Sequence, residues 1–524
     1  MRKNATFLFC LVIALALAIT FEAKAEQKKL PGKPAQKEQP KLGGTLIFGL
    51  GKEFANPNPF IATSSIFQFV KETAYESLLT TNDAGAIIPN LAESYEISSG
   101  GSAFTIHLRK GVKFHNGKEM KAEDVVWSAN HVKDPKNGAY GQNKIEDVKS
   151  VEKLDDYTVK FTLVSPTVVF LSYLANIRML PIVPANSLQP GQIKLEKNIF
   201  VPGTGPFIFE QYQPGFDTVV KKYPDYWGKP AYLDKIIFRP ITDGANRFNA
   251  LRTGDVQMAD RLSTLEAARV KKGEIKGISI LEDPLGGIKH LIVNYDNPLF
   301  QKREMRQALS YAIDKKRLVD ESYFGAAAPA DILMDPKGIW AKAANLPPHK
   351  RDLAKAKSLL KAAGYTGQEL VLIEQKSQTQ LGESLQRMLG EAGIKVKIEL
   401  LEAGVMNDRV RAGKYDLYPA GGNITSDPVI TMKPEYNTAT TEKSRYSNPK
   451  VDKLFDSLDR EFNEKKRLNI FKELAALINN DVADIPLIYE IRYVGMLDKV
   501  HGFGPPKGYS YTSNGNYFKT TWLK

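Results

Sequence analysis

The sequence predicts a large mixed α/β protein with more than one domain. Its 524 residues exceed what a single hydrophobic core usually serves. Several short segments, such as residues 104–108, alternate apolar and polar side chains as half-buried strands do. Elsewhere apolar residues recur at the spacing of one helix face, as at Met305, Ala308, Leu309, Ala312 and Ile313. A composition of 43% hydrophobic and 25% charged residues is ordinary for globular domains.

The first 25 residues have the three parts of a secretory signal peptide. Arg2 and Lys3 supply a basic start, and the apolar run from Phe7 to Ile19 that follows is short for a membrane span. Ala23-Lys24-Ala25 fits the small-residue cleavage pattern. We therefore expect cleavage after Ala25 and export of the mature chain.

The single cysteine, Cys10, lies inside this apolar run. It lacks the small preceding residue of a lipoprotein signal, so we expect no lipid anchor. The mature chain would then have no disulfide and no thiol chemistry. Residues 26–41 contain five lysines, three prolines and no aromatic residue, which is typical of a disordered linker.

The chain is basic, with a formal net charge of +13. The signal peptide contributes Arg2, Lys3, Lys24 and Glu22, a net +2, so the mature chain would carry +11. A basic protein can bind nucleic acid, membrane surfaces or anionic solutes. Both signs of charge are mixed along this chain, without a basic block in the predicted folded part, which argues against nucleic acid as a partner.

The N-terminal half is predicted to be rich in short strands. In chain order we expect a strand, a helix, a turn and two further strands at residues 43–48, 64–79, 83–85, 104–108 and 159–163. Asn116-Gly117 predicts a tight turn, because both residues tolerate positive φ. A helix is expected from about Ala122, with Glu123 and Asp124 in its first turn, where carboxylates complement the backbone dipoles.

The C-terminal half alternates strands and helices. Residues 369–374, 381–392 and 394–400 have the pattern strand, helix, strand, which predicts a right-handed parallel crossover. We further expect two strands at 288–294 and 485–493, and four helices at 305–313, 353–363, 451–461 and 465–479.

The stretch from Leu108 to Asn130 resembles a signature of extracellular solute-binding protein family 5, the peptide, nickel and opine type of binding protein of ABC importers. The matching positions are Leu108, Arg109, Gly111, Val112, Phe114, Asn116, Gly117, Ala122, Asp124, Val125 and Ser128. Lys121 stands where the family usually has threonine. Because threonine would cap the helix, we expect a weaker cap here.

Further stretches extend this resemblance from about Leu42 to the C-terminus; they are 90–95, 203–207, 223–228, 233–236 and 306–314. It implies an α/β, type II-like periplasmic binding protein of two lobes joined by two crossing strands, near 286–294 and 485–493. The implied first lobe is 42–285, with an inserted subdomain at about 76–198. The second lobe would be 286–488, and 489–524 would return to the first lobe.

The resemblance implies a periplasmic receptor that delivers a small ligand, of oligopeptide type or related, to an ABC transporter permease in the membrane by hinge closure. A non-peptide ligand, such as an opine, an oligosaccharide or a metal chelate, is the alternative. A periplasmic hydrolase is a third, less favoured hypothesis. We expect a monomer without cofactor or nucleic acid.

Motifs for chemistry are missing from the sequence. The six histidines form no metal-binding spacing, and no nucleophile elbow, Walker loop or dinucleotide fingerprint follows a predicted strand. The 59 carboxylates could meet in many ways, but surface charge is the default for them. We therefore predict no catalytic residue, no metal site and no enzyme activity.

Candidate ligand contacts are rigid aromatic residues in predicted loops, because a binding cleft combines apolar walls with a few polar groups. Phe54, Trp340 and Tyr446 are such residues, although Trp340 could equally be part of a core. Asn56 is a polar candidate, but its Asn-Pro-Asn-Pro setting is also explained by turn chemistry.

Residues 420–428 form the most informative loop. Peptide-binding relatives in the family have about G-W-x-x-D-Y-x-[DE]-P here, and the first aspartate anchors the α-amino group of the peptide. Alignment on Asp427-Pro428 places Ile424 at that aspartate and Gly421 at the tryptophan, which weakens the case for a peptide. The ligand candidates in this loop are Asn423, Ile424, Thr425 and Asp427.

Arg445 completes the candidates. Residues 445–449 fit the family's R-Y-x-N-P stretch, and a guanidinium can hold a ligand carboxylate by two parallel hydrogen bonds. The alternative is an ordinary surface arginine.

Overall fold

The computed structural model describes residues 39–61, 66–82, 86–348, 350–376, 379–425, 427–441, 443–504 and 517–524. The predicted signal peptide, most of the predicted linker and the predicted turn at 83–85 lie outside these residues. The chain divides into two compact units, Met1–Gln39 and Pro40–Lys524. Everything below concerns the second unit.

The core of this unit is an 11-stranded sheet that runs through both lobes. The first-lobe strands are β1 (Thr45–Leu50), β8 (Phe207–Gln211), β9 (Thr218–Lys222), β10 (Lys235–Pro240) and β11 (Met258–Ala259). The second-lobe strands are β13 (Ala328–Pro329), β14 (Glu369–Gln375), β15 (Lys395–Leu401) and β16 (Leu417–Gly422). Two long strands, β12 (Ile278–Val293) and β17 (Ile485–Leu497), lie between these groups.

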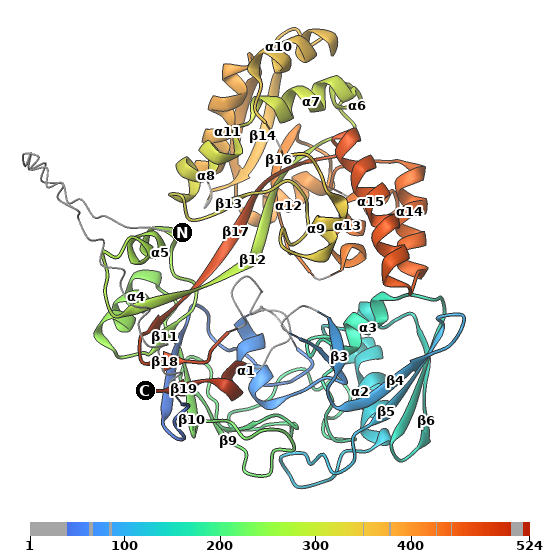
Figure 1. The fold of residues 1–524 in the computed structure, drawn as a ribbon, viewed down its shortest axis with the longest axis vertical. Coiled ribbons are helices and arrows are strands. Elements are labelled where there is room, and N and C mark those ends of the chain that lie inside the picture. The colour runs from blue at the N-terminus through green and yellow to red at the C-terminus, as the bar shows by residue number, and fades with distance from the viewer. Residues whose placement is uncertain are drawn as a thin grey trace, which may run out of the picture. The chain divides into compact units, whose positions relative to one another are not determined.

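Strands β12 and β17 carry the chain from one lobe to the other (Figure 1). Residues 278–283 of β12 pair with 492–497, beside β11 of the first lobe. After a bulge, residues 287–291 pair with 485–490, beside β16 of the second lobe. The predicted two-lobe fold with two crossing strands is therefore confirmed.

Strand β12 is longer than predicted, because it starts at Ile278. Pro284 and the glycine pair at 286–287 resemble a strand break in the sequence. In the structure they form a register shift between Asp283 and Gly287, after which pairing with β17 resumes. A bulge leaves a residue unpaired and bends a strand without ending it.

The first lobe also holds a separate antiparallel sheet in the order β4-β5-β7-β6. Its strands are β4 (Ala92–Ile97), β5 (Ala103–Leu108), β6 (Val148–Asp155) and β7 (Thr158–Leu163), and a hairpin of β2 (Leu79–Thr81) and β3 (Ile87–Pro89) precedes it. The helices of this lobe are α1 (Ile66–Ala74), α2 (Ala122–Lys133), α3 (Val169–Leu174), α4 (Gly244–Thr253) and α5 (Thr264–Lys271).

Helix α1 ends earlier than the predicted limit at Leu79. Gly205 N–H donates to Ala74 O, and Ala92 N–H donates to Leu78 O. These long-range partners hold the segment after Ala74 in a non-helical conformation. Helix α2 starts at Ala122 as predicted; Lys121 provides no side-chain cap, but its N–H donates to Asp124 at 2.9 Å.

The second lobe is built from ten helices in the described part of the chain. They are α6 (Pro298–Gln301), α7 (Arg303–Ala312), α8 (Lys315–Tyr323), α9 (Ile339–Ala344), α10 (Leu353–Ala362), α11 (Thr379–Glu391), α12 (Ala403–Arg411), α13 (Pro428–Tyr436), α14 (Pro449–Arg460) and α15 (Glu464–Asp481). Strands β14 and β15 pair in parallel across α11, as predicted.

Helices cover both faces of the sheet in the second lobe. Leu291 and Val293 of β12 belong to a core shared with α7, α8, α10 and α11. Ile288 and Ile292 point to the opposite face, toward α9 and α12–α15. This alternation is the period of two that a strand imposes on its side chains.

The C-terminal segment packs against first-lobe residues. Phe503 and Phe518 belong to the same core as Phe48 of β1, with ring centroids 6.2 and 6.0 Å from that ring. Strand β18 (Val500–His501) pairs there with β19 (Trp522–Leu523). The residue limits of the lobes and of the inserted subdomain stay predictions.

Candidate functional site

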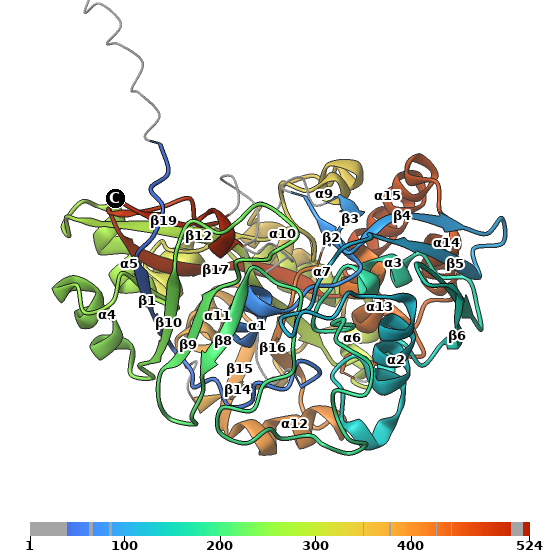
Figure 2. The same ribbon diagram turned by 90° about the horizontal axis from the view of Figure 1, so that it is seen from below.

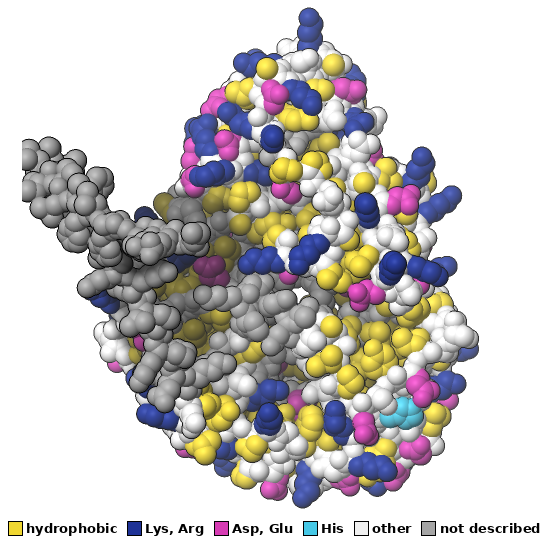
Figure 3. All heavy atoms as spheres, viewed as in Figure 1, with side chains coloured by type: hydrophobic (Ala, Val, Ile, Leu, Met, Phe, Trp, Pro, Cys, Tyr) yellow, Lys and Arg dark blue, Asp and Glu magenta, His cyan; other side chains and the backbone are white. Residues whose placement is uncertain are grey.

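The candidate site lies where the two lobes face each other beside the crossing strands. Figure 3 shows the surface hollowed between the lobes, with hydrophobic side chains on both sides of the hollow. Gly422, the last residue of β16, pairs with Ile288 just after the bulge of β12. The loop at 423–427 therefore starts close to the crossing, on the second lobe.

Within this loop, Asn423 is exposed, whereas Ile424 is only 8% exposed and belongs to the second-lobe core. Thr425 organises the loop internally. Its N–H donates to Thr431 Oγ1 at 3.0 Å, and its hydroxyl donates to Asp427 O at 3.0 Å. The loop thus presents an amide at its surface and an aliphatic side chain behind it.

Asp427 is occupied by contacts within the second lobe. Its Oδ1 accepts from Val429 N at 2.8 Å, which caps α13. Arg467 of α15 pairs with both carboxylate oxygens, at 2.9 and 3.3 Å. The Arg467 guanidinium also lies 5.0 Å from the ring centroid of Trp340, so the Trp340 ring covers one side of the ion pair between Arg467 and Asp427.

Trp340 was expected in a loop, and that expectation is wrong. It lies in helix α9, is 7% exposed, and meets Phe471 edge-on at a centroid distance of 5.2 Å. Trp340 and Ala344 of α9 are buried against apolar residues of α13, α14 and α15. This packing stabilises the helix at a position where a loop was expected. The structure therefore brings Trp340, Ile424 and Asp427 into one core.

Arg445 and Tyr446 also lie in the second lobe. Arg445 Nε is 2.9 Å from Asp296, and its Nη2 donates to Arg411 O at 2.8 Å. Tyr446 OH donates to Asp481 at 2.7 Å, with its ring against Tyr295. Tyr295 and Asp296 follow the end of β12 at Val293. That end lies about 17 Å along the strand from Ile288, at a rise of about 3.4 Å per residue. Tyr446 belongs to the same second-lobe core as Ile424 and Trp340, whereas the partners of Arg445 lie outside the 423–427 loop.

Phe54 and Asn56 belong to the first lobe. Phe54 is 4% exposed and stacks on Phe209 at a centroid distance of 6.1 Å. Asn56 donates to Ile193 O at 2.8 Å and accepts from Asn58 N at 3.0 Å. Both residues shape the loop between β1 and α1, and their contact with a ligand stays a prediction.

Sequence reasoning missed a group of charged residues around α1. Figures 1 and 2 show α1 on the side of the first lobe that faces the crossing strands. Lys71 is 2% exposed, and its ammonium donates to Asn58 O at 2.6 Å. Burial lowers the pKa of Lys71 to about 7 and raises the pKa of Glu72 to about 8. The sequence gave no reason to single out Lys71 and Glu72, because either residue could lie on a solvated helix face.

Arg178 lies beside these two residues and affects the pKa values of both. Its guanidinium stacks over the Tyr140 ring at 4.3 Å, and its buried Nε has no hydrogen-bond partner among the described residues. Buried donors are normally satisfied. Arg178 therefore offers an unused donor beside α1.

The segment just before Arg178 touches the second lobe. Val168 N–H donates to Asp459 O at 2.9 Å, and the Thr167 hydroxyl donates to the Asp459 carboxylate at 2.5 Å. Val169 is 4% exposed and belongs to the core of the second lobe. Burial is the largest cause that raises the pKa of Asp459. The lobes therefore meet at α3 and α14 as well as along the crossing strands.

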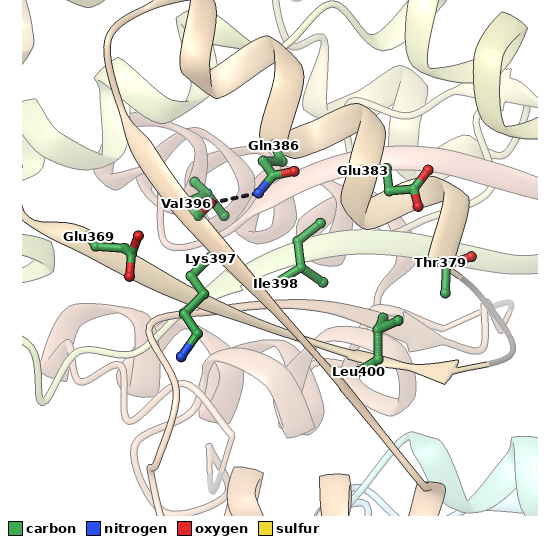
Figure 4. A pocket seen from close by; sticks show the side chains of 8 residues that line it. All are labelled: Glu369, Thr379, Glu383, Gln386, Val396, Lys397, Ile398 and Leu400. Carbon is green, nitrogen blue, oxygen red and sulfur yellow. Dashed lines mark hydrogen bonds between the residues drawn. The ribbon is translucent and has the colours of Figure 1, made fainter.

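A second hollow, of about 450 Å³, lies at the outer edge of the sheet between β15 and α11 (Figure 4). Gln386 donates there to Val396 O at 2.7 Å, which satisfies a backbone acceptor of the edge strand. Lys397 of the same strand also lines the hollow. These features protect an exposed sheet edge, and β15 lies four strands from β17 in the sheet order.

The family comparison matches residues 86–442 to the bacterial extracellular solute-binding proteins, family 5. The chain belongs to this family. Family 5 proteins bind peptides or small solutes and work with ABC permeases. The chain is thus a solute-binding protein of the ABC-importer type, as the resemblance implied.

Individual relatives have different ligands. The glutathione-binding protein GsiB of Salmonella typhimurium is 28% identical over 494 residues, covering 89% of this chain and 93% of GsiB. The binding protein AgaA of A. tumefaciens R10, solved with agropinic acid, is 27% identical with a TM-score of 0.71 and covers 92% of this chain and 99% of AgaA. DppA of Helicobacter pylori, solved with the peptide STSA, is 28% identical with a TM-score of 0.73 and covers 92% of this chain and 98% of DppA.

Two observations bear on other classes of function. Within the described ranges, no three His, Cys, Asp or Glu residues are grouped so that they could hold a metal ion. The same part of the chain contains no helix with the length and apolar character to span a membrane.

Proposed function

We propose that this chain is a periplasmic receptor that closes around a solute, hands it to an ABC permease and catalyses no reaction. The pairing of β12 and β17 on both sides of the bulge carries this proposal, because two strands that bend at a shared bulge make a hinge. A solute that touches both lobes binds the closed form more tightly and so shifts the equilibrium toward it.

The predicted export through a signal peptide, with cleavage after Ala25, is part of the same proposal. We expect the receptor to act as a monomer, with a membrane permease as its macromolecular partner. N-terminal sequencing of the exported protein tests the cleavage site. A mature N-terminus other than Glu26 would contradict it.

For the ligand, we propose a solute with an acidic group and an uncharged part. The unpaired Nε of Arg178 supports an acidic group, since an arginine holds a carboxylate well. Ile424 supports the uncharged part, because a buried ammonium beside an aliphatic side chain would lack a counter-ion. An acidic opine-like solute fits both features, and so does a peptide held by its carboxylate end.

Calorimetry with free and N-acetylated di-, tri- and pentapeptides tests the ligand proposal. Acetylation should change affinity little, whereas loss of a paired charge costs about 2–5 kcal/mol. Native mass spectrometry of protein from its own periplasm would identify the bound solute, and recovery of that solute unchanged after incubation tests the absence of catalysis. Tight binding of free peptides that acetylation abolishes would overturn the ligand proposal. A chemically converted solute would favour the hydrolase hypothesis.

Arg178→Ala should weaken binding of the identified solute at least tenfold. Arg252→Ala, at an exposed position of α4, is the matched control. Equal affinities of the two variants would show that Arg178 does not hold the solute. That result would not bear on the proposed transport role.

A further inference from the structure

A hollow of about 680 Å³ lies in the second lobe, between α7 on one side and α13 and α15 on the other. Its volume is in the range of small-molecule sites. The hollow is separate from the 423–427 loop, because none of the loop residues lines it. Tyr436 at the far end of α13 reaches it instead.

The floor of this hollow holds a buried cation. Lys315 at the start of α8 is 6% exposed, and its ammonium donates to Ala330 O at 2.6 Å and to Asp331 at 2.8 Å. An ammonium has three donors, so one remains for a further acceptor.

The other carboxylate on the floor is already satisfied. Asp484 is 8% exposed, accepts from Tyr436 OH at 2.6 Å, and lies 2.5 Å from His290 Nδ1. Asp484 is therefore held by groups that line or underlie the hollow. Among the described residues Asp484 accepts no hydrogen bond from Lys315, so the third N–H of Lys315 has no fixed acceptor.

Three cations at the rim have no acidic partner in the described part of the chain. Arg303 contacts the amide of Asn480, and Lys355 donates to Tyr311 OH at 2.8 Å. Neither of them, nor Lys350, has a carboxylate within 4.0 Å among the residues that the structure places. Arg351 and Asp352, also at the rim, are of opposite sign. In all, five Lys or Arg residues and three Asp residues line the hollow, so its lining has a net positive charge.

Apolar side chains form the walls. Ile332, Leu333, Met432 and Ile478 line the hollow, and all four belong to the same second-lobe core. An apolar wall above a buried cation suits a molecule with a hydrocarbon body and one negative end. A free metal ion or a large polar sugar would leave these walls in contact with water.

We propose that this hollow is a second binding site, for a small carboxylate with an apolar body. The carboxylate accepts the third hydrogen bond of Lys315 and faces the cations of the rim. The hydrocarbon part packs between α7 and α15. The site is independent of the solute in the interlobe hollow, and its occupant touches only the second lobe.

Isothermal titration calorimetry of the full-length mature protein with hexanoate tests the proposal. Hexan-1-ol and hexylammonium, which share the chain length but not the charge, serve as comparison probes. We expect saturable 1:1 binding of hexanoate, at least tenfold weaker binding of hexan-1-ol, and no binding of hexylammonium.

Two variants locate the site. Lys315→Met removes the ammonium, and Ser310→Trp on α7 fills the hollow while leaving Lys315 and its partner Asp331 in place. Each should weaken hexanoate binding at least tenfold, while Arg252→Ala at an exposed position of α4 leaves it unchanged. Circular dichroism checks that the variants fold. If Lys315→Met does not fold, hexanoate binding by Ser310→Trp tests the proposal.

The proposal is overturned if hexanoate shows no saturable binding, or if it binds Ser310→Trp as well as the unmodified protein. It is also overturned if Arg178→Ala alone abolishes hexanoate binding, because that result would place the probe near α1. None of these outcomes bears on the receptor function, which calorimetry with the periplasmic solute measures separately.

Discussion

Arg467 meets both carboxylate oxygens of Asp427, at 2.9 and 3.3 Å, and the two side chains are only 8% and 10% exposed. Asp427 is the acidic residue of the loop that could have replaced the missing peptide anchor at Ile424. Its charge is already neutralised, so a peptide ammonium would have to displace Arg467 from a buried site. This pairing supports a ligand that is not held by a free amino group.

The same ion pair predicts a large effect on stability. Arg467→Met should lower the free energy of unfolding by about 3–5 kcal/mol, because it leaves the buried Asp427 carboxylate without its partner. Urea unfolding followed by circular dichroism measures this. Arg269→Met is the control: its pair with Glu274 is about half exposed on both sides and should contribute less than about 1 kcal/mol. Equal losses in the two variants would contradict the buried role of Arg467.

Thr167 and Asp459 join the lobes by a hydrogen bond of 2.5 Å. Thr167→Val keeps the shape of the side chain and removes the donor, which should cost about 1 kcal/mol of closure energy. The ligand-free protein should then have a larger radius of gyration by small-angle scattering, and solute affinity should fall about fivefold.

Thr438→Val serves as the control for closure, because its hydroxyl donates to Ser447 within the second lobe. It should leave the radius and the affinity unchanged. If Thr167→Val behaves like this control, the contact between α3 and α14 does not determine closure.

Gly286 at the bulge leaves no space for a side chain. A Cβ there would lie 2.6 Å from Glu490 O and 2.7 Å from Arg492 N, both backbone atoms of β17. Gly286→Ala should destabilise the protein by about 1–3 kcal/mol and reduce the compaction that solute causes. Gly390→Ala in α11, where a Cβ meets nothing within 4 Å, should stabilise by about 0.5–1 kcal/mol. Thermal unfolding and small-angle scattering compare the two, and a neutral Gly286→Ala would show that the strands can separate freely.

Glu374 predicts a pH dependence of stability. Glu374 is 3% exposed, and burial raises the pKa of its carboxyl group to about 7 from the ordinary value of 4.5. Between about pH 4.5 and 7 the folded state keeps a proton that the unfolded state has lost, so stability falls as pH rises through this window.

Glu374→Gln has no such proton, and Gly382 N–H can still donate to the amide oxygen. The variant should therefore gain stability relative to the unmodified protein between pH 5 and pH 8, by on the order of 2–3 kcal/mol. Urea unfolding at several pH values measures the difference. Glu473→Gln, at an exposed position of α15, is the control, and the same gain in both variants would rule out burial as the cause.

Local patterns in the sequence predicted most of the second-lobe elements. The strand–helix–strand order of β14, α11 and β15 and the helices α7, α10, α14 and α15 agree with the predicted ranges within a few residues. Periodicity reports which face of an element is buried, and that depends on residues only a few positions apart. The family signature at 108–130 supplied the two-lobe architecture, which periodicity could not.

Tertiary structure decided the partners of charges and the route of the crossing strands. Asp427 meets an arginine 40 residues away, and Arg445 meets Asp296 at the end of β12 rather than the 423–427 loop. Arg178 gains its importance from Tyr140 and α1, which are distant in sequence. Whether a charged side chain is solvated, paired or available to a ligand depends on which distant segments pack around it, and this information is not contained in the local pattern of the chain.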